Sequence, residues 1–157
     1  LSQVQTDNDA AFVGTRQHGA GEAGFEVTMF EEELYASSGH GLENIGWLAI
    51  EQGSGAASGY DYEAGVTGNV YTHEWKDIVF DTAFDDLPQL LANIGSSDGG
   101  DATVLRLAGL DTNGAGAMMQ EETSKDAELA HTTELIDYFA IEGEGELYGT
   151  VNTEMLV

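Results

Sequence analysis

The sequence contains no cysteine, only one proline and only four basic residues among its 157 positions. Without cysteine, neither disulfides nor thiolate metal sites are available. No stretch approaches the roughly 18 consecutive apolar residues of a transmembrane helix, and no basic, apolar leader is present, so we expect no membrane insertion. The chain begins at Leu1 rather than at methionine, so we expect it to be a piece of a larger multidomain protein, in which a secretion signal could be encoded elsewhere.

Basic residues are scarce against a large excess of acids. Four Lys and Arg residues face 29 Asp and Glu residues, which gives a formal net charge of −25. Such a charge argues against nucleic acid, anionic membranes and sulfated ligands as partners. A surface this acidic repels itself at low salt, so it suits high ionic strength, bound Ca²⁺, or the saline habitat of a marine or halophilic bacterium. We therefore predict salt-dependent stability.

Two stretches of the chain share one pattern. Residues 40–51 and 131–142 both read H-x-x-E-x-I-x-(W/Y)-x-A-I-E, at an offset of 91 positions. This similarity predicts an internal repeat, with a first, N-terminally incomplete copy in residues 1–60 and a second copy in residues 61–157. Because residues 147–152 follow the second copy much as residues 62–67 follow the first, the alternative to two modules is one fused, pseudo-symmetric body in which 147–152 close the N-terminal sheet.

Short alternating segments separated by glycine predict an all-β chain. Phe25, Val27 and Met29 alternate with polar residues, which is the period of a strand, and no long segment has the helical period. Strands every 8 to 12 residues are typical of an antiparallel β-sandwich. Residues 52–59 are expected to form a polar, glycine-rich loop, and the G-x-G-x-x-G match at 19–24 a hairpin turn, because a strand and no helix follows it.

The repeated strand supports two interpretations. In a strand, Glu134, Ile136, Tyr138, Ala140 and Glu142 share one face, and the other face is also largely apolar, so a central strand covered on both sides is the favoured interpretation. The alternative places Tyr138 and its counterpart Trp47 on a sugar-binding face. There aromatic rings stack on pyranose C–H groups while neighbouring acids accept sugar hydroxyls.

The pairs His40–Glu43 and His131–Glu134 have the residue types of a metal site. Three positions apart in a strand, however, the two side chains point to opposite faces, so a shared metal requires the histidine to lie in the preceding loop. We favour a structural role, in which the imidazole or carboxylate fixes that loop by hydrogen bonds.

Acid clusters offer the hard oxygen ligands that Ca²⁺ prefers, although none matches an EF-hand loop. A solvated acidic surface is favoured over a Ca²⁺ site. The residues expected to bind Ca²⁺, if any does, are Asp98, Asp101, Glu121 and Glu122. No nucleophile elbow is present and no pair of carboxylates is singled out by spacing, so we expect no enzyme.

An ordered set of motifs resembles the H-type lectin domain. The motifs are Trp75 to Phe84, Pro88 to Ala92, Asp98-Gly-Gly-Asp101, Arg106 and the H-T-T-E strand from His131. The resemblance implies a six-stranded antiparallel β-sandwich that binds sugars and forms trimers or higher homo-oligomers, with related repeats in marine bacterial surface and polysaccharide-degrading proteins. In that family an acid, an arginine and an aromatic hold the sugar, which implies Asp101, Arg106 and Tyr138 here and Asp9, Arg16 and Trp47 as first-copy counterparts.

We therefore predict a non-catalytic, extracellular or cell-surface module that binds a glycan or polysaccharide. The chain is also similar to the cysteine-free, acidic, glycine-rich proteins exported by type I systems, which supports that location. The main alternative is a structural or adhesive repeat stabilised by Ca²⁺, and the third is a small glycan-degrading enzyme. The residues expected to contact ligand are Trp47, Tyr138, Trp75, Asp101, Arg106, His131, Glu134, His40 and Glu43.

Overall fold

The computed structural model describes residues 1–35, 39–57 and 59–144, and within them it contains strands and no helix. The strands are β1 (Ser2–Val4), β2 (Gly14–Gly21), β3 (Gly24–Phe30), β4 (Ile45–Trp47), β5 (Gly53–Ala57), β6 (Tyr60–Val66), β7 (Lys76–Val79), β8 (Gln89–Ile94), β9 (Thr103–Ala108), β10 (Gly114–Glu121) and β11 (Ile136–Glu142). Every strand pair is antiparallel, so the predicted all-β class is confirmed. The described residues include no candidate membrane-spanning helix.

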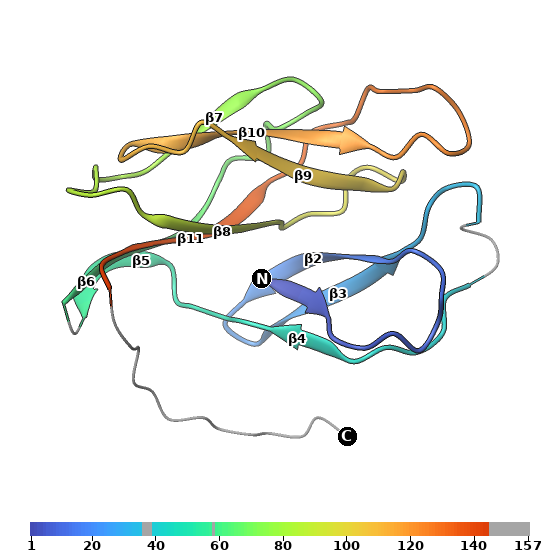
Figure 1. Ribbon diagram of the computed structural model, residues 1–157, viewed down its shortest axis with the longest axis horizontal. Helices are drawn as coiled ribbons and strands as arrows, with labels where there is room; N and C mark the ends of the chain where they lie inside the picture. Colours follow the sequence, from blue (N-terminus) through green and yellow to red (C-terminus); the bar gives the residue numbers. More distant parts are fainter. Residues whose placement is uncertain (36–38, 58, 145–157) are drawn as a thin grey trace.

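Two sheets pack face to face to form the main core. One has the order β7-β10-β9 and the other β5-β6-β11-β8, and Figure 1 shows them as two layers. Apolar side chains from both layers meet between them, as in a β-sandwich. These buried residues are Tyr71, Ile78, Phe80, Ile94, Ala117, Met119, Ile136, Tyr138 and Ala140.

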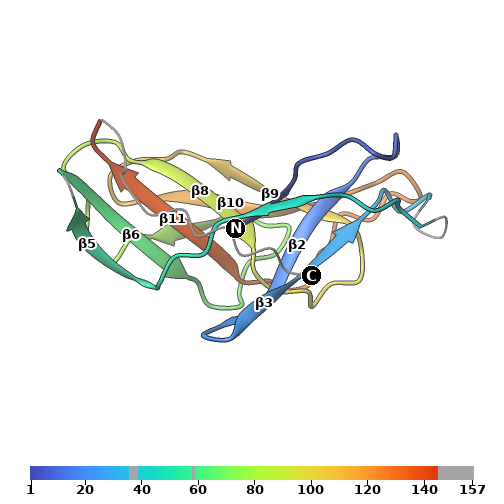
Figure 2. The same ribbon diagram turned by 90° about the horizontal axis from the view of Figure 1, so that it is seen from below.

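The N-terminal part contributes two smaller sheets. The β2–β3 hairpin and the β1–β4 pair lie to one side of the four-stranded sheet (Figures 1 and 2). The hairpin turn between β2 and β3 confirms the prediction for residues 19–24, where Gly19 (φ 65°) and Gly24 (φ 142°) adopt left-handed backbone angles that side chains disfavour.

The strand predicted in the second copy is confirmed as a central strand. β11 lies between β6 and β8, and its Ile136 and Ala140 are completely buried. The first copy differs, because β4 has only three residues, pairs only with β1 among the described strands, and leaves Trp47 58% exposed. Gly46 supplies no side chain to bury, and the Gln5 side chain packs over it instead.

The expectation of a loop at residues 52–59 was wrong. β5 lies within this range and pairs with β6 along the edge of the four-stranded sheet. Its small residues pack against the neighbouring strand, since a Cβ on Gly55 would lie only 3.2 Å from the Tyr62 hydroxyl. The closing strand expected at residues 147–152 lies outside the described residues, and the division into copies at residue 60 stays a prediction.

Candidate functional site

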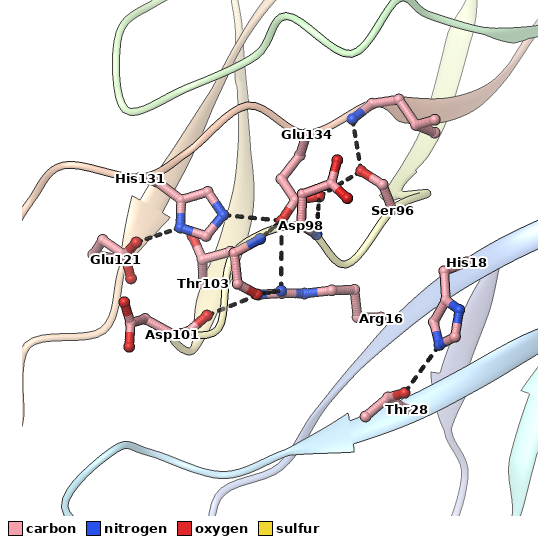
Figure 3. Close-up of polar contacts among 12 residues, drawn as sticks. Arg16, His18, Thr28, Ser96, Asp98, Asp101, Thr103, Glu121, His131 and Glu134 are labelled. Atoms are coloured by element: carbon pink, nitrogen blue, oxygen red, sulfur yellow. Dashed lines mark hydrogen bonds and ion pairs between the residues drawn. The ribbon is translucent and has the colours of Figure 1, made fainter.

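The most elaborate polar structure in the described chain surrounds His131, in the loop before β11. Its Nε2 lies 3.1 Å from Glu134 Oε1, and its Nδ1 makes a short contact with Glu121 Oε1 (Figure 3). His131 and Glu121 are each 6% exposed and Glu134 is fully buried. Both ring nitrogens are therefore occupied by carboxylates, which leaves neither free for a metal or for proton transfer to a substrate.

Glu134 anchors the loop that joins β8 to β9. Its carboxylate accepts hydrogen bonds from the Gly99 amide at 2.8 Å, from the Asp98 amide at 3.1 Å and from the Ser96 hydroxyl. The Ser96 hydroxyl oxygen in turn accepts the Leu135 amide at 2.9 Å. A Cβ at Gly99 would lie 2.3 Å from the His131 ring, so the loop approaches the imidazole as closely as only glycine permits. The pair was predicted to fix the loop before β11, whereas the loop that Glu134 holds is the one between β8 and β9.

Arg16 brings the N-terminal part of the chain to the same loop. From β2 it donates to the Gly99 carbonyl at 2.7 Å and to the Asp101 carbonyl at 2.9 Å, and its Nη1 lies 3.6 Å from Glu134 Oε1. The arginine is only 4% exposed. A planar guanidinium with several fixed donors suits such a position, in which two carbonyls and a carboxylate are bound at once (Figure 3).

A second cluster repeats this bonding pattern around His40. His40 Nε2 lies 3.3 Å from Glu43 Oε1 and His40 Nδ1 lies 3.3 Å from Glu31 Oε1. Glu43 accepts the Thr6 hydroxyl and the amides of Asn8 at 2.9 Å and Asp9 at 3.1 Å. The following amide, of Asn44, donates to the Thr6 hydroxyl oxygen at 2.8 Å, as Leu135 does to Ser96.

The members of the two clusters correspond at fixed offsets. Thr6, Asp9 and Glu31 precede Ser96, Gly99 and Glu121 by 90 positions, and the His–Glu pairs are 91 apart. The clusters also differ. Within the described residues no arginine contacts Glu43, and His40 Nδ1 faces Glu31 without a hydrogen bond. The Asp9 carboxylate accepts the Ala11 and Gly41 amides, which has no counterpart at Gly99. These matched hydrogen bonds are a fact of the geometry, while duplication of an ancestral module stays a prediction.

The environment shifts the pKa values of the His131 cluster in opposite directions. Burial disfavours the charged form of Glu134, but the hydrogen bonds from His131, Ser96 and the Gly99 and Asp98 amides outweigh it and lower the pKa of Glu134 to about 2. Burial likewise opposes charge on His131, yet its hydrogen bonds to Glu134 and Glu121 outweigh that effect and raise the pKa of His131 above 6.5. The charged pair is thus favoured in the folded state.

These shifts predict a maximum in the stability contributed by the cluster. Glu134 stabilises the fold fully above its unfolded pKa near 4.5 and loses this contribution as the pH falls towards about 2. His131 stabilises it fully below 6.5 and loses this as the pH rises through its higher folded pKa. The difference in unfolding free energy between wild type and Glu134→Gln, measured by urea titration, should therefore be largest between pH 4.5 and 6.5. A difference that does not vary with pH would contradict the assignment.

Most of the residues predicted to bind a sugar lie apart from one another. Tyr138 is a core residue, 8% exposed, whose hydroxyl donates to Glu63 Oε1 at 2.5 Å, so its placement as an exposed stacking ring is corrected. Burial and the Glu63 carboxylate raise the pKa of the Tyr138 hydroxyl. Trp47 and Trp75 are 58% and 55% exposed, but Trp47 ends β4 whereas Trp75 directly precedes β7 of another sheet. Trp75 is close to Gly116 of β10, on the sheet that carries the exposed Arg106.

The residues predicted to bind Ca²⁺ are distributed over several contacts. Glu121 is buried against His131, and Glu122 accepts the Glu33 amide at 2.8 Å and bonds from Ser124. Asp98 and Asp101 are exposed. Across residues 1–35, 39–57 and 59–144, no group of three or more His, Asp or Glu side chains is placed to hold a metal ion. Ca²⁺ binding stays a prediction.

A cleft lies between the N-terminal part and the four-stranded sheet. It has a volume of about 790 Å³ and is bordered by apolar side chains such as Phe25, Ile50 and Phe139, with Gln17 and Asp137 among its polar groups. The Gln17 amide donates to Asp137 at 2.8 Å across the two parts. Sequence reasoning missed this bond and the bonds of Arg16. Two pairs of residues 90 positions apart, Glu31 with Glu121 and Thr6 with Ser96, were sequence signals for further members of the clusters.

Comparisons with known proteins find one relative of this all-β chain, which contains two buried His–carboxylate clusters. No family model matches the sequence and no solved structure matches it, so neither comparison identifies an H-type lectin domain. The chain is similar to halomucin of Haloquadratum walsbyi, with 26% identity over 159 aligned residues that cover all of this chain. The chain spans about 2% of the length of that protein. This similarity is compatible with an extracellular module.

Proposed function

We propose that the chain is a non-catalytic, structural β-sandwich module of a larger extracellular protein, adapted to remain folded in concentrated salt. The observation that carries this proposal is the pair of buried clusters. The side chains best suited to acid–base or metal chemistry, His40 and His131, each lie between two carboxylates, one of which, Glu43 or Glu134, anchors a loop. Such groups serve the architecture rather than a substrate.

The charge of the chain supports the saline part of the proposal. Arg16 is buried, and so are Glu31, Glu63, Glu121 and Glu134, so most of the net charge of −25 lies on the surface. Exposed carboxylates repel one another over about 10 Å at 0.1 M salt but only about 3 Å at 1 M. The names halomucin and Haloquadratum both carry the prefix for salt, which is in keeping with this adaptation.

Salt should raise the melting temperature of the module. Moving from 0.1 M to 2 M NaCl is expected to raise it by roughly 10 °C, because screening removes several kcal/mol of self-repulsion and each kcal/mol shifts a domain of this size by about 2–4 °C. Melts followed by circular dichroism test this, and a melting temperature insensitive to NaCl would contradict the proposal. A further rise with CaCl₂ at equal ionic strength would instead support a Ca²⁺-stabilised module.

Glycan binding is the second candidate, and the cleft is the observation that favours it. Its volume of about 790 Å³ is in the range of ligand sites, with apolar walls and a few polar groups. The same protein preparation on a glycan array at high salt separates the two candidates. Binding that is lost with Phe25→Ala and retained with Trp75→Ala would place a sugar in this cleft.

A further inference from the structure

Arg106 is an exposed cation with no hydrogen bond or ion pair within the part of the chain that the structure describes. It occupies in β9 the position that Arg16 occupies in β2. Arg16 is paired with Thr28 of β3, and Arg106 is paired with Met118 of β10. Arg106 follows Arg16 by 90 positions, and Met118 follows Thr28 by 90 positions. One of these equivalent arginines is buried in a contact, and the other faces solvent.

The groups that Arg16 binds also have counterparts. Arg16 binds the carbonyls of Gly99 and Asp101 beside Glu134, and the equivalent groups are the carbonyls of Asp9 and Ala11 beside Glu43. Glu43 accepts the Asn8 and Asp9 amides as Glu134 accepts those of Asp98 and Gly99. The Asp9 carboxylate fixes this turn further by accepting the Ala11 and Gly41 amides, bonds that Gly99 cannot make. In the described residues, no hydrogen bond to the Asp9 or Ala11 carbonyl is found.

A donor and an acceptor are thus left over on the same chain. If a two-fold axis related the two clusters within one chain, the Arg16 contact would occur twice. Arg106 would then bind the Asp9–Ala11 turn of its own chain. The described residues contain only the Arg16 half of that relation. The contact is therefore of the head-to-tail kind, which can be repeated from one molecule to the next.

We propose that Arg106 docks on the Asp9–Ala11 turn of a second copy of this chain. The proposal rests on the structural role given above and names its partner. The guanidinium binds the two turn carbonyls, and the exposed Asp7 and the Asp9 carboxylate add favourable charge around it. High salt assists association, because two bodies that each carry −25 repel one another until they are screened.

This intermolecular contact is weaker than the one inside the chain. The bond from Gln17 to Asp137 has no equivalent, because Leu107 and Gly46 occupy the corresponding positions. Phe30, whose ring lies 5.6 Å below the Arg16 guanidinium, is replaced by Gln120. A weak association calls for a test that traps the complex.

Cysteine trapping is unambiguous here because the chain has no cysteine of its own. His18 and Ser97 border one small cavity beside the Arg16 contact, and their counterparts are Ala108 and Asp7. Ala108→Cys protein mixed with Asp7→Cys protein in 2 M NaCl and a glutathione buffer should form a mixed disulfide dimer. The matched control is Asp61→Cys, which makes the same charge change at an exposed position of β6.

The expected yield of mixed dimer is about tenfold above that with Asp61→Cys, and Arg106→Ala in the Ala108→Cys chain should remove about tenfold. A yield equal to the control, or one that Arg106→Ala leaves unchanged, overturns the docking. Melting curves of each variant verify that it is folded. Salt-dependent melting of the wild type together with no trapping would refute the docking alone, whereas salt-independent melting would refute the proposed function.

Discussion

Replacing Glu134 with alanine is expected to lower the free energy of unfolding by about 3–5 kcal/mol. The carboxylate is completely buried and accepts bonds from the Ser96 hydroxyl, the Asp98 and Gly99 amides and His131. Its removal leaves these donors and the charge of Arg16 without their common acceptor. Urea unfolding at a fixed high salt concentration measures the change.

The size of this effect depends on charge as well as on shape. Glu134→Gln keeps the side-chain volume but replaces one acceptor oxygen with an amide donor that faces backbone amides, so we expect it to cost about 2–3 kcal/mol. Glu43→Ala removes the equivalent acceptor from a cluster with no arginine and should cost less than Glu134→Ala. The exposed Glu74→Ala is the control, with an effect within about 0.5 kcal/mol. Equal losses for Glu134 and Glu74 would show that the cluster does not stabilise the fold.

The role of the two clusters was predictable in part from spacing. In a strand, side chains three residues apart point to different faces, and this expectation disfavoured a shared metal and favoured loop anchoring. His131 instead lies in the loop before β11, so its ring contacts Glu134 directly at 3.1 Å, which the strand pattern did not predict. The remaining members could not be predicted, because Glu121, Ser96 and Gly99 reach Glu134 and His131 only through the packing of three separate strands. Spacing along one strand carries no information about such neighbours.

The fold shows the same division between local and long-range information. Alternation of apolar residues predicted the all-β class, but it did not predict β5, whose residues are all glycine, alanine or serine. Equal patterns nevertheless gave unequal strands, since β11 is central while β4 is a three-residue segment beside β1. Tyr138 and Trp47 occupy the same place in the pattern, yet one is 8% and the other 58% exposed. The difference comes from what covers each strand, because β7 and β10 pack over β11 and not over β4.

Replacing Arg16 with alanine is the other change with a large expected effect, a loss of about 3 kcal/mol in unfolding free energy. It removes the two part-buried hydrogen bonds that join β2 to the loop after β8 and leaves the Gly99 and Asp101 carbonyls without this donor. Arg16→Lys keeps the charge but has no planar fork to reach both carbonyls, so it should recover only about half of the loss.

Arg106→Ala is a matched control for Arg16→Ala, because it removes the same side chain and charge from the equivalent position of an exposed strand surface. At low protein concentration, where copies do not associate, its effect should stay within about 0.5 kcal/mol. The double variant Arg16→Ala, Glu134→Gln should lose less than the sum of the single losses, with a coupling of about 1 kcal/mol, since Nη1 and Oε1 lie only 3.6 Å apart. Additive losses, or equal losses for Arg16 and Arg106, would mean that the two parts of the chain are held together by the cleft-lining apolar residues rather than by this arginine.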